Sequence, residues 1–225
     1  MWFDYKLSAI VTVIFLFIIF IIVTIRLKFI KDDPLPVFLP SSRQPLPDFE
    51  TGDCVFVSYR STRGKLVKIF TGSMWSHMGM IYKQANGRSF VIEAVYYDPQ
   101  QHGVLKTPLE EWLNFNGRRT LGWLRKRGPK IPDSEMDRVF QLVQHCDMDT
   151  LVLNWLKAVV NRKYFPEKKS KFYCSELIAT LCQELKIMDK VLMPASYSPK
   201  TFMELRLPLI NGHWFEPPMI FKVNP

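Results

Sequence analysis

The longest uncharged run in the sequence, Leu7 to Ile25, restricts most strongly what this chain can fold into. The only polar side chains among its nineteen residues are one serine and two threonines, whose hydroxyls can bond back to a helix. This length is sufficient for a helix that crosses a bilayer. A cleaved signal peptide is the alternative, but Arg26, Lys28 and Lys31 follow the run where a small-residue cleavage site would stand. We therefore expect an uncleaved, single-pass membrane anchor.

The residues that flank this run predict the orientation of the chain and where its folded part begins. Three basic residues follow the span, against Lys6 and the terminal amine before it, so the positive-inside rule places the bulk of the protein in the cytosol. An endomembrane and a virion envelope both fit. Five prolines between Asp32 and Asp48 remove amide donors and fix φ, which predicts a stiff stalk of about 50 Å at most. We expect an anchor with a basic flank over residues 1–31, a stalk over 32–48 and one folded domain over 49–225.

Composition excludes several classes of protein. The chain has 225 residues, of which 48% are hydrophobic, so the folded part can bury a core. Its net charge of +9 is spread along the sequence, which fits an anionic membrane surface better than nucleic acid. There is no CxxC, Walker loop, GxGxxG or zinc-like Cys and His spacing, so we expect no cofactor and no metal. The four cysteines form no disulfide framework, and we expect free thiols.

The folded domain is expected to combine antiparallel strands with helices, in an α+β arrangement. Patterns of alternating hydrophobicity predict strands, and capping residues with helical periodicity predict helices. The expected strands cover residues 54–59, 76–82, 89–96, 120–125 and 219–223, and the expected helices cover 64–70, a segment starting at Thr107-Pro108, a segment starting at Asp133, 151–160 and a short turn capped by Ser198-Pro199.

The stretch from Phe172 to Leu185 predicts a helix with a cysteine at its start. Leu177, Ile178, Leu181, Cys182 and Leu185 fall at helical spacing on one stripe, and Cys174 lies at the N-terminal end of it. The opposite face is expected to be exposed to solvent; it contains Ser175, Glu176, Thr180, Gln183 and Glu184. Unpaired amides and the helix dipole favour a thiolate in a first turn. Two alternatives stay open: Cys174 could be a packed core residue, and Ser170 could start the helix a turn earlier.

One of the four histidines is better placed than the others to act as a base for Cys174. His102 and His213 each lie beside a glycine in an expected loop, and His145 lies at the end of a helix. His77 lies on the expected strand SHMGMIY, whose backbone gives the rigidity that a general base needs.

The hairpin that follows His77 decides whether Glu93 can orient it. A two-residue turn at Asn86-Gly87 would place His77 opposite Tyr96 and Glu93 on the other face. A three-residue loop with Gly87 in the left-handed conformation places His77 opposite Val95, and Glu93 then shares its face. Because Gly87 suits that conformation, we expect the second register, in which Glu93 favours the imidazolium of His77 and thereby the thiolate of Cys174.

These segments together resemble the NlpC-type papain-like superfamily in its circularly permuted form, the YiiX/YaeF-like amidases, with lecithin:retinol acyltransferase-like enzymes as more distant relatives. The resemblance covers about residues 48–198 and rests on TGDCVFV, WSHMGMIY, FVIEAV and FYCSELI, in the permuted order in which the cysteine helix follows the strands. It implies a permuted papain-like fold with a thiol nucleophile at Cys174, a base at His77 and a polar orienter at Glu93. A glutamate at that third position fits the YiiX-like branch better than the acyltransferase branch.

The sequence therefore predicts a membrane-anchored thiol hydrolase that attacks an amide or ester carbonyl through an acyl-enzyme on Cys174. The expected partners are the bilayer, through residues 7–25, and an acyl, peptide or lipid substrate. Two alternatives remain: a lipid acyltransferase or phospholipase-like thiol enzyme, which passes an acyl chain to another molecule, and a non-enzymatic membrane scaffold on the same fold.

Overall fold

The structure is a computed structural model that describes residues 47–96, 100–116, 120–149 and 170–221. The expected anchor, all but the end of the expected stalk, and the expected helix over 151–160 lie outside these residues. No helix within the described ranges has both the length and the apolar character needed to cross a membrane.

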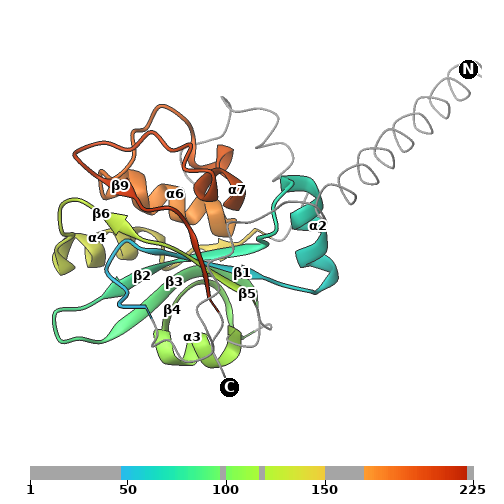
Figure 1. Ribbon diagram of the computed structural model, residues 1–225. Coiled ribbons are helices and arrows are strands. Elements are labelled where there is room, and N and C mark those ends of the chain that lie inside the picture. The colour runs from blue at the N-terminus through green and yellow to red at the C-terminus, as the bar shows by residue number, and fades with distance from the viewer. Residues whose placement is uncertain (1–46, 97–99, 117–119, 150–169, 222–225) are drawn as a thin grey trace, which may run out of the picture.

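A mixed arrangement of one large antiparallel sheet and several helices forms the domain, as the α+β expectation requires (Figure 1). In chain order the elements are β1 (Cys54–Ser58), α2 (Thr62–Thr71), β2 (His77–Lys83), β3 (Ser89–Tyr96), β4 (His102–Pro108), α3 (Leu109–Asn116), β5 (Thr120–Leu124), β6 (Lys126–Arg127), α4 (Asp133–Val143), β7 (Asp147–Met148), β8 (Lys171–Phe172), α6 (Cys174–Glu184), the 3-10 helix η1 (Pro194–Ser196), α7 (Pro199–Met203), β9 (Trp214–Phe215) and β10 (Met219–Phe221).

The six-stranded sheet has the order β10-β5-β1-β2-β3-β4, and all its neighbours run antiparallel. The strand expected over residues 219–223 is present as β10, and it forms one edge of the sheet by pairing with β5. Two further pairs lie outside this sheet: β6 with β9, and the parallel pair of β7 with β8.

Side chains alternate between the two faces of the sheet and build a core on each. Phe56 and Met80 pack with α6 on one face, whereas Val55 and Ile81 pack with Trp112 of α3 on the other. Figure 1 shows α6 and α3 on opposite sides of the strands. The sheet is therefore covered on both faces, which explains why its central strands are buried throughout.

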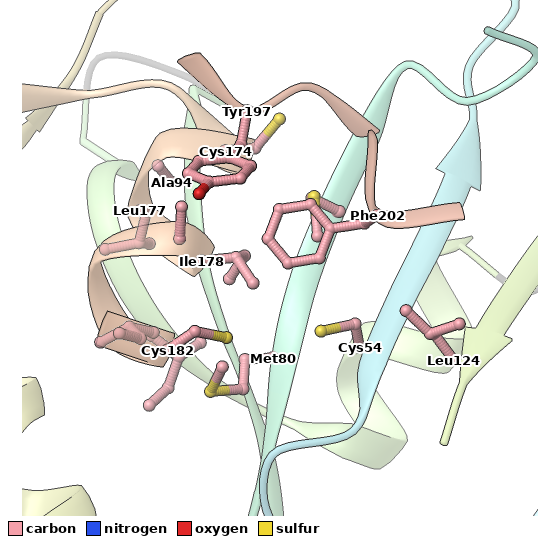
Figure 2. Close-up of a cluster of buried hydrophobic side chains, with 14 of the residues drawn as sticks. Cys54, Met80, Ala94, Leu124, Cys174, Leu177, Ile178, Cys182, Tyr197 and Phe202 are labelled. Atoms are coloured by element: carbon pink, nitrogen blue, oxygen red, sulfur yellow. The ribbon is translucent and has the colours of Figure 1, made fainter. Parts of the chain in front are cut away.

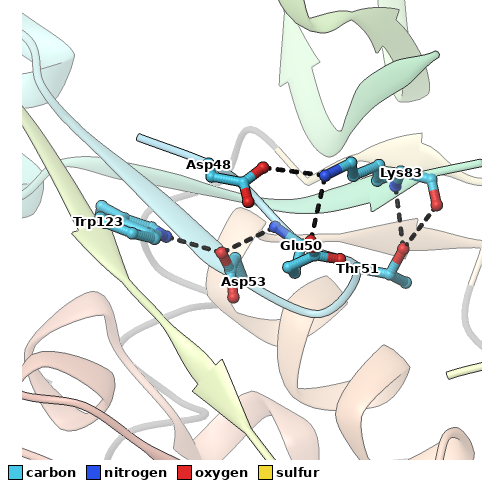
Figure 3. Close-up of polar contacts among 6 residues, drawn as sticks. All are labelled: Asp48, Glu50, Thr51, Asp53, Lys83 and Trp123. Carbon is cyan, nitrogen blue, oxygen red and sulfur yellow. Dashed lines mark hydrogen bonds and ion pairs between the residues drawn. The ribbon is translucent and has the colours of Figure 1, made fainter. Parts of the chain in front are cut away.

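A buried carboxylate fixes the start of β1. The Asp53 carboxylate is fully buried and accepts a hydrogen bond from Trp123 Nε1 at 2.9 Å (Figure 3). It also accepts one from the Lys126 amide at 2.7 Å. Nearby, the Lys83 ammonium at the end of β2 pairs with the carboxylates of Asp48 and Glu50. These contacts hold the segment that leads into β1 against the last residue of β2, at the opposite end of that strand from His77.

Two expectations about local structure were wrong. Residues 102–108 form the edge strand β4, which pairs with β3 over its whole length, so His102 lies in a strand and Pro108 ends it instead of opening the next helix. The sequence misled because Gly103 and Pro108 are typical of loops, but an edge strand tolerates both.

The face of α6 that was expected to be exposed to solvent is largely buried. Ser175, Glu176 and Gln183 are at most 6% exposed, because the segment that runs through η1 and α7 covers them. Ser175 Oγ donates to the Tyr197 carbonyl, and Gln183 Nε2 donates to the carbonyls of Asp189 and Leu192. The stripe with Leu177, Ile178, Leu181 and Cys182 is buried as predicted.

Candidate functional site

The site is centred on His77, the first residue of β2. Its backbone is fixed by the pairing of β2 with β1, in which His77 lies opposite Val57. The side chain is 4% exposed, and the ring of Tyr59 lies against it with 5.6 Å between ring centroids. The imidazole is therefore held by packing as well as by the strand.

The hairpin between β2 and β3 has the register that the three-residue loop requires. Met80 pairs with Ile92 and Lys83 with Ser89, the Gln84 amide donates to the Arg88 carbonyl at 2.8 Å, and Gly87 has φ +83. A left-handed φ of this kind favours glycine, which is why the loop closes here. The same register places His77 and Glu93 on one face, as the sequence predicted.

Glu93 contacts His77 directly. Glu93 Oε2 lies 2.8 Å from His77 Nε2, and the Glu93 side chain is fully buried. Because Nε2 faces the carboxylate, Nδ1 is the ring nitrogen that remains to face a nucleophile. Gly79 lies opposite Glu93 in this register, and a side chain there would clash with Val91 Cγ1 at 2.5 Å.

Helix α3 also contacts this pair, through a hydrogen bond to Glu93. Trp112 Nε1 donates to the same Glu93 Oε2 at 2.8 Å, so one carboxylate oxygen accepts from both the indole and the imidazole side. Asn116, one turn later, accepts from Tyr59 Oη at 3.0 Å and donates to the Trp112 carbonyl. The apolar spacing of α3 is typical of a core residue at Trp112 and contains no signal that separates a tryptophan that donates to Glu93 from one that only packs.

Cys174 is the first residue of α6. The helix begins there because Phe172 belongs to β8, which pairs with β7, so the alternative start at Ser170 is wrong. The Tyr173 amide donates to Glu176 Oε2 at 3.4 Å, and the first intrahelical bond runs from the Leu177 amide to the Tyr173 carbonyl at 2.9 Å. The amides of Cys174 and Ser175 precede this bond, so they make no intrahelical hydrogen bond. The positive end of the helix dipole therefore lies at the thiol.

The thiol lies at the margin of the larger core cluster (Figure 2). Cys174 is 8% exposed, next to Tyr197 from the covering segment, whereas Cys54 and Cys182 lie deeper and are fully buried. Burial raises the pKa of both deeper thiols, so they are poor nucleophiles. None of the four cysteines, all of which lie in the described ranges, forms a disulfide bond.

The tip of α6 and the start of β2 bring Cys174 and His77 into contact. Helix α6 packs on one face of the sheet, and β2 is one of the strands that it contacts, with His77 as the first residue of that strand. Burial would lower the pKa of His77, but hydrogen bonds and charge interactions with Cys174 and Glu93 outweigh burial and raise it to about 10. The His77 ring thus interacts with both Cys174 and Glu93, and these interactions favour its imidazolium form.

The other three histidines lie elsewhere. His102 pairs with Asp147 at 3.3 Å on the surface, His213 Nδ1 lies 3.4 Å from Lys126 Nζ, and His145 follows α4. Within the described ranges, no group of three or more His, Cys, Asp or Glu side chains is placed to hold a metal ion.

Comparison with known proteins shows a family and a similar solved structure. The sequence model of a family described as permuted papain-like amidase enzymes, YaeF/YiiX, C92 family, matches residues 48–198. The structure is similar to a solved structure, the metalloprotein yiiX from Escherichia coli O157:H7, with 21% sequence identity, a TM-score of 0.42, and coverage of 75% of this chain and 89% of that one. No curated protein matches the sequence.

Proposed function

Because this chain belongs to the family of permuted papain-like amidases, we propose that it hydrolyses an amide or ester bond with Cys174 as nucleophile, His77 as acid and base, and Glu93 as the group that orients His77. Family membership makes the chain a cysteine hydrolase, and the cysteine helix follows the strands as in the permuted form. The observation that carries the residue assignment is the placement of the His77 ring between Glu93 and Cys174.

The reaction follows from these contacts. The Cys174 thiolate attacks the carbonyl carbon, and the amides at the start of α6 are placed to stabilise the oxyanion that forms. His77 then transfers its proton to the leaving amine or alcohol as the carbon to leaving-group bond breaks, which leaves an acyl-enzyme. A water molecule attacks this thioester while His77 takes its proton, and return of that proton to sulfur releases the acid.

A thiol-directed acyl probe tests the assignment. We expect it to label Cys174 in the full-length protein and to label a Cys174→Ala variant at background level. His77→Ala should reduce the rate of labelling by about 100-fold, because the thiol loses the group that takes its proton. Cys146→Ala is the matched control, since Cys146 is a partly exposed thiol outside the site. Unchanged labelling of Cys174 in the His77→Ala variant would refute a dyad.

We also propose that residues 7–25 hold the enzyme to a membrane. The support is the length of this uncharged run and the basic residues after it. The full-length protein should stay in the membrane fraction after extraction with alkaline carbonate, and Ile14→Arg combined with Phe17→Arg should release it. Release of the unaltered chain by carbonate alone would contradict the proposal.

A further inference from the structure

The segment that contains β1, α2 and β2 is strongly cationic. Residues 54–92 include six arginines and lysines and not one aspartate or glutamate. Two of these cations are accounted for within the domain: the Lys83 ammonium pairs with Asp48 and Glu50, and Arg88 lies over the ring of Phe90. Those on and just before α2 need another explanation.

Helix α2 lies at the end of the sheet where the site is. It connects the end of β1 to the start of β2, and only five residues separate Thr71 from His77. The Ser76 amide donates to the Val57 carbonyl, and the Tyr59 amide donates to Ser76 Oγ. Tyr59 in turn packs on the His77 ring, so the connection before α2 forms part of the wall of the site.

Lys68 points back from α2 to this wall. Its ammonium donates to Ser58 Oγ at 2.9 Å, and Ser58 is the last residue of β1. By alternation along β1, Ser58 lies on the same face as Phe56, which is the face that α6 covers. The Lys68 ammonium therefore lies on the Cys174 side of the sheet, beside the end of the strand that pairs with His77.

The charge of Lys68 is not compensated by the part of the chain that the structure describes. No salt bridge there involves Lys68, Lys65 or Arg60, and α2 has no acidic residue in its first turn. Burial, together with the positive charges of Arg60 and Lys65, lowers the pKa of Lys68. Three cations that repel one another at the end of the sheet where β2 begins are unfavourable, and an anion bound among them relieves the repulsion.

We propose that Lys68, with Arg60 and Lys65, binds an anionic group of the substrate, a phosphate or a carboxylate, while Cys174 attacks the neighbouring amide or ester carbonyl. This inference rests on the proposed function and adds the class of substrate to it. The anion is either part of a soluble molecule or the headgroup of a lipid; the chemistry that Lys68 recognises is the same in both.

Two esters that differ in one charge test the proposal with the full-length protein in neutral detergent micelles. The probes are p-nitrophenyl butyrate, which is neutral, and the mono-p-nitrophenyl ester of glutarate, which carries a carboxylate. We expect Lys68→Met to lower kcat/KM for the anionic ester about tenfold, mainly through KM, and to leave the neutral ester unchanged. Lys68→Arg should retain most of the preference, and salt should weaken it in the unaltered enzyme.

Lys83→Met is the matched control, because Lys83 lies at the other end of β2, about 20 Å along the strand from His77. It should not change the ratio of the two kcat/KM values. If Lys68→Met does not fold, Lys65→Met provides the test, since Lys65 is exposed. Competition by glycerol phosphate and by micellar phosphatidic acid against the anionic ester identifies the source of the anion, and either competition should weaken in Lys68→Met.

The outcomes separate this inference from the proposed function. If Lys68→Met lowers kcat/KM equally for both esters, or for neither, the anion site is overturned. The proposed function still stands in that case, provided that Cys174→Ala abolishes hydrolysis. Hydrolysis that survives Cys174→Ala overturns the proposed function itself.

Discussion

Replacing Glu93 by glutamine separates the electrostatic role of this residue from its structural one. The carboxylate is fully buried, and His77 Nε2 and Trp112 Nε1 meet the same oxygen, each at 2.8 Å. A glutamine can place its amide oxygen at that position. Glu93→Gln therefore keeps an acceptor for both donors and removes the negative charge.

The size of the effect follows from the pKa of His77. Its rise from 6.5 to about 10 corresponds to about 5 kcal/mol in favour of the imidazolium, shared between Cys174 and Glu93. Without the carboxylate the pKa must fall, so the imidazolium is lost at a lower pH. We expect the alkaline limb of kcat/KM to move down by about 1 to 3 pH units, and kcat/KM at neutral pH to fall about 100-fold.

The assay is the pH dependence of p-nitrophenyl ester hydrolysis together with unfolding in urea. Glu93→Ala removes the acceptor as well and leaves two buried donors unsatisfied, at about 1–3 kcal/mol each, whereas Glu93→Gln should cost less. Asp53→Asn is a matched control, because Asp53 is also buried and also accepts from a tryptophan, Trp123. It should lower stability and leave the alkaline limb in place. An alkaline limb and a kcat/KM in Glu93→Gln that equal those of the unaltered enzyme would refute the reasoning.

Three further outcomes are expected around the same residues. Trp112→Phe removes the second donor to Glu93 but keeps a ring in the core, so kcat/KM should fall about tenfold with a loss of about 1 kcal/mol in unfolding free energy; equal activity would show that Glu93 needs no second donor. Gly79→Ala should destabilise the fold by about 1–3 kcal/mol in a urea titration, because its Cβ would lie 2.5 Å from Val91 Cγ1; unchanged stability would contradict the close approach. Since the folded pKa of His77 is raised, its contribution to stability is complete below about pH 6.5 and is lost as pH rises to about 10, so a His77→Gln variant should show a flatter dependence of unfolding free energy over that range.

The strands of the large sheet other than β4, and the main helices that the structure describes, could be predicted from the sequence because each carries its own local signal. Gly87 decided the hairpin register, since a left-handed residue is needed at one position of the loop, and that register places Glu93 on the face of His77. The helix of Cys174 was visible as a stripe of apolar residues. These are short-range properties, and the structure confirms them.

The parts that the sequence did not reveal depend on contacts between distant segments. Ser175 and Glu176 have polar side chains on the outer face of α6, and only the later segment that returns over this face buries them. The spacing of apolar residues in α3 predicts a core position for Trp112. Its hydrogen bond to Glu93 depends on how α3 packs against β3. Lys68 likewise gains its position through Ser58, which lies ten residues earlier in the chain.

The order of the segments also determines when the enzyme becomes competent during translation. The strands that hold His77 and Glu93 leave the ribosome first, and the helix that starts at Cys174 follows about eighty residues later, with its cover, the turn around Tyr197, later still. A nascent chain or a fragment truncated before α6 contains His77 and Glu93 but lacks Cys174, the proposed nucleophile. Premature reaction with cellular acyl groups is therefore excluded until nearly all of the domain has been synthesised.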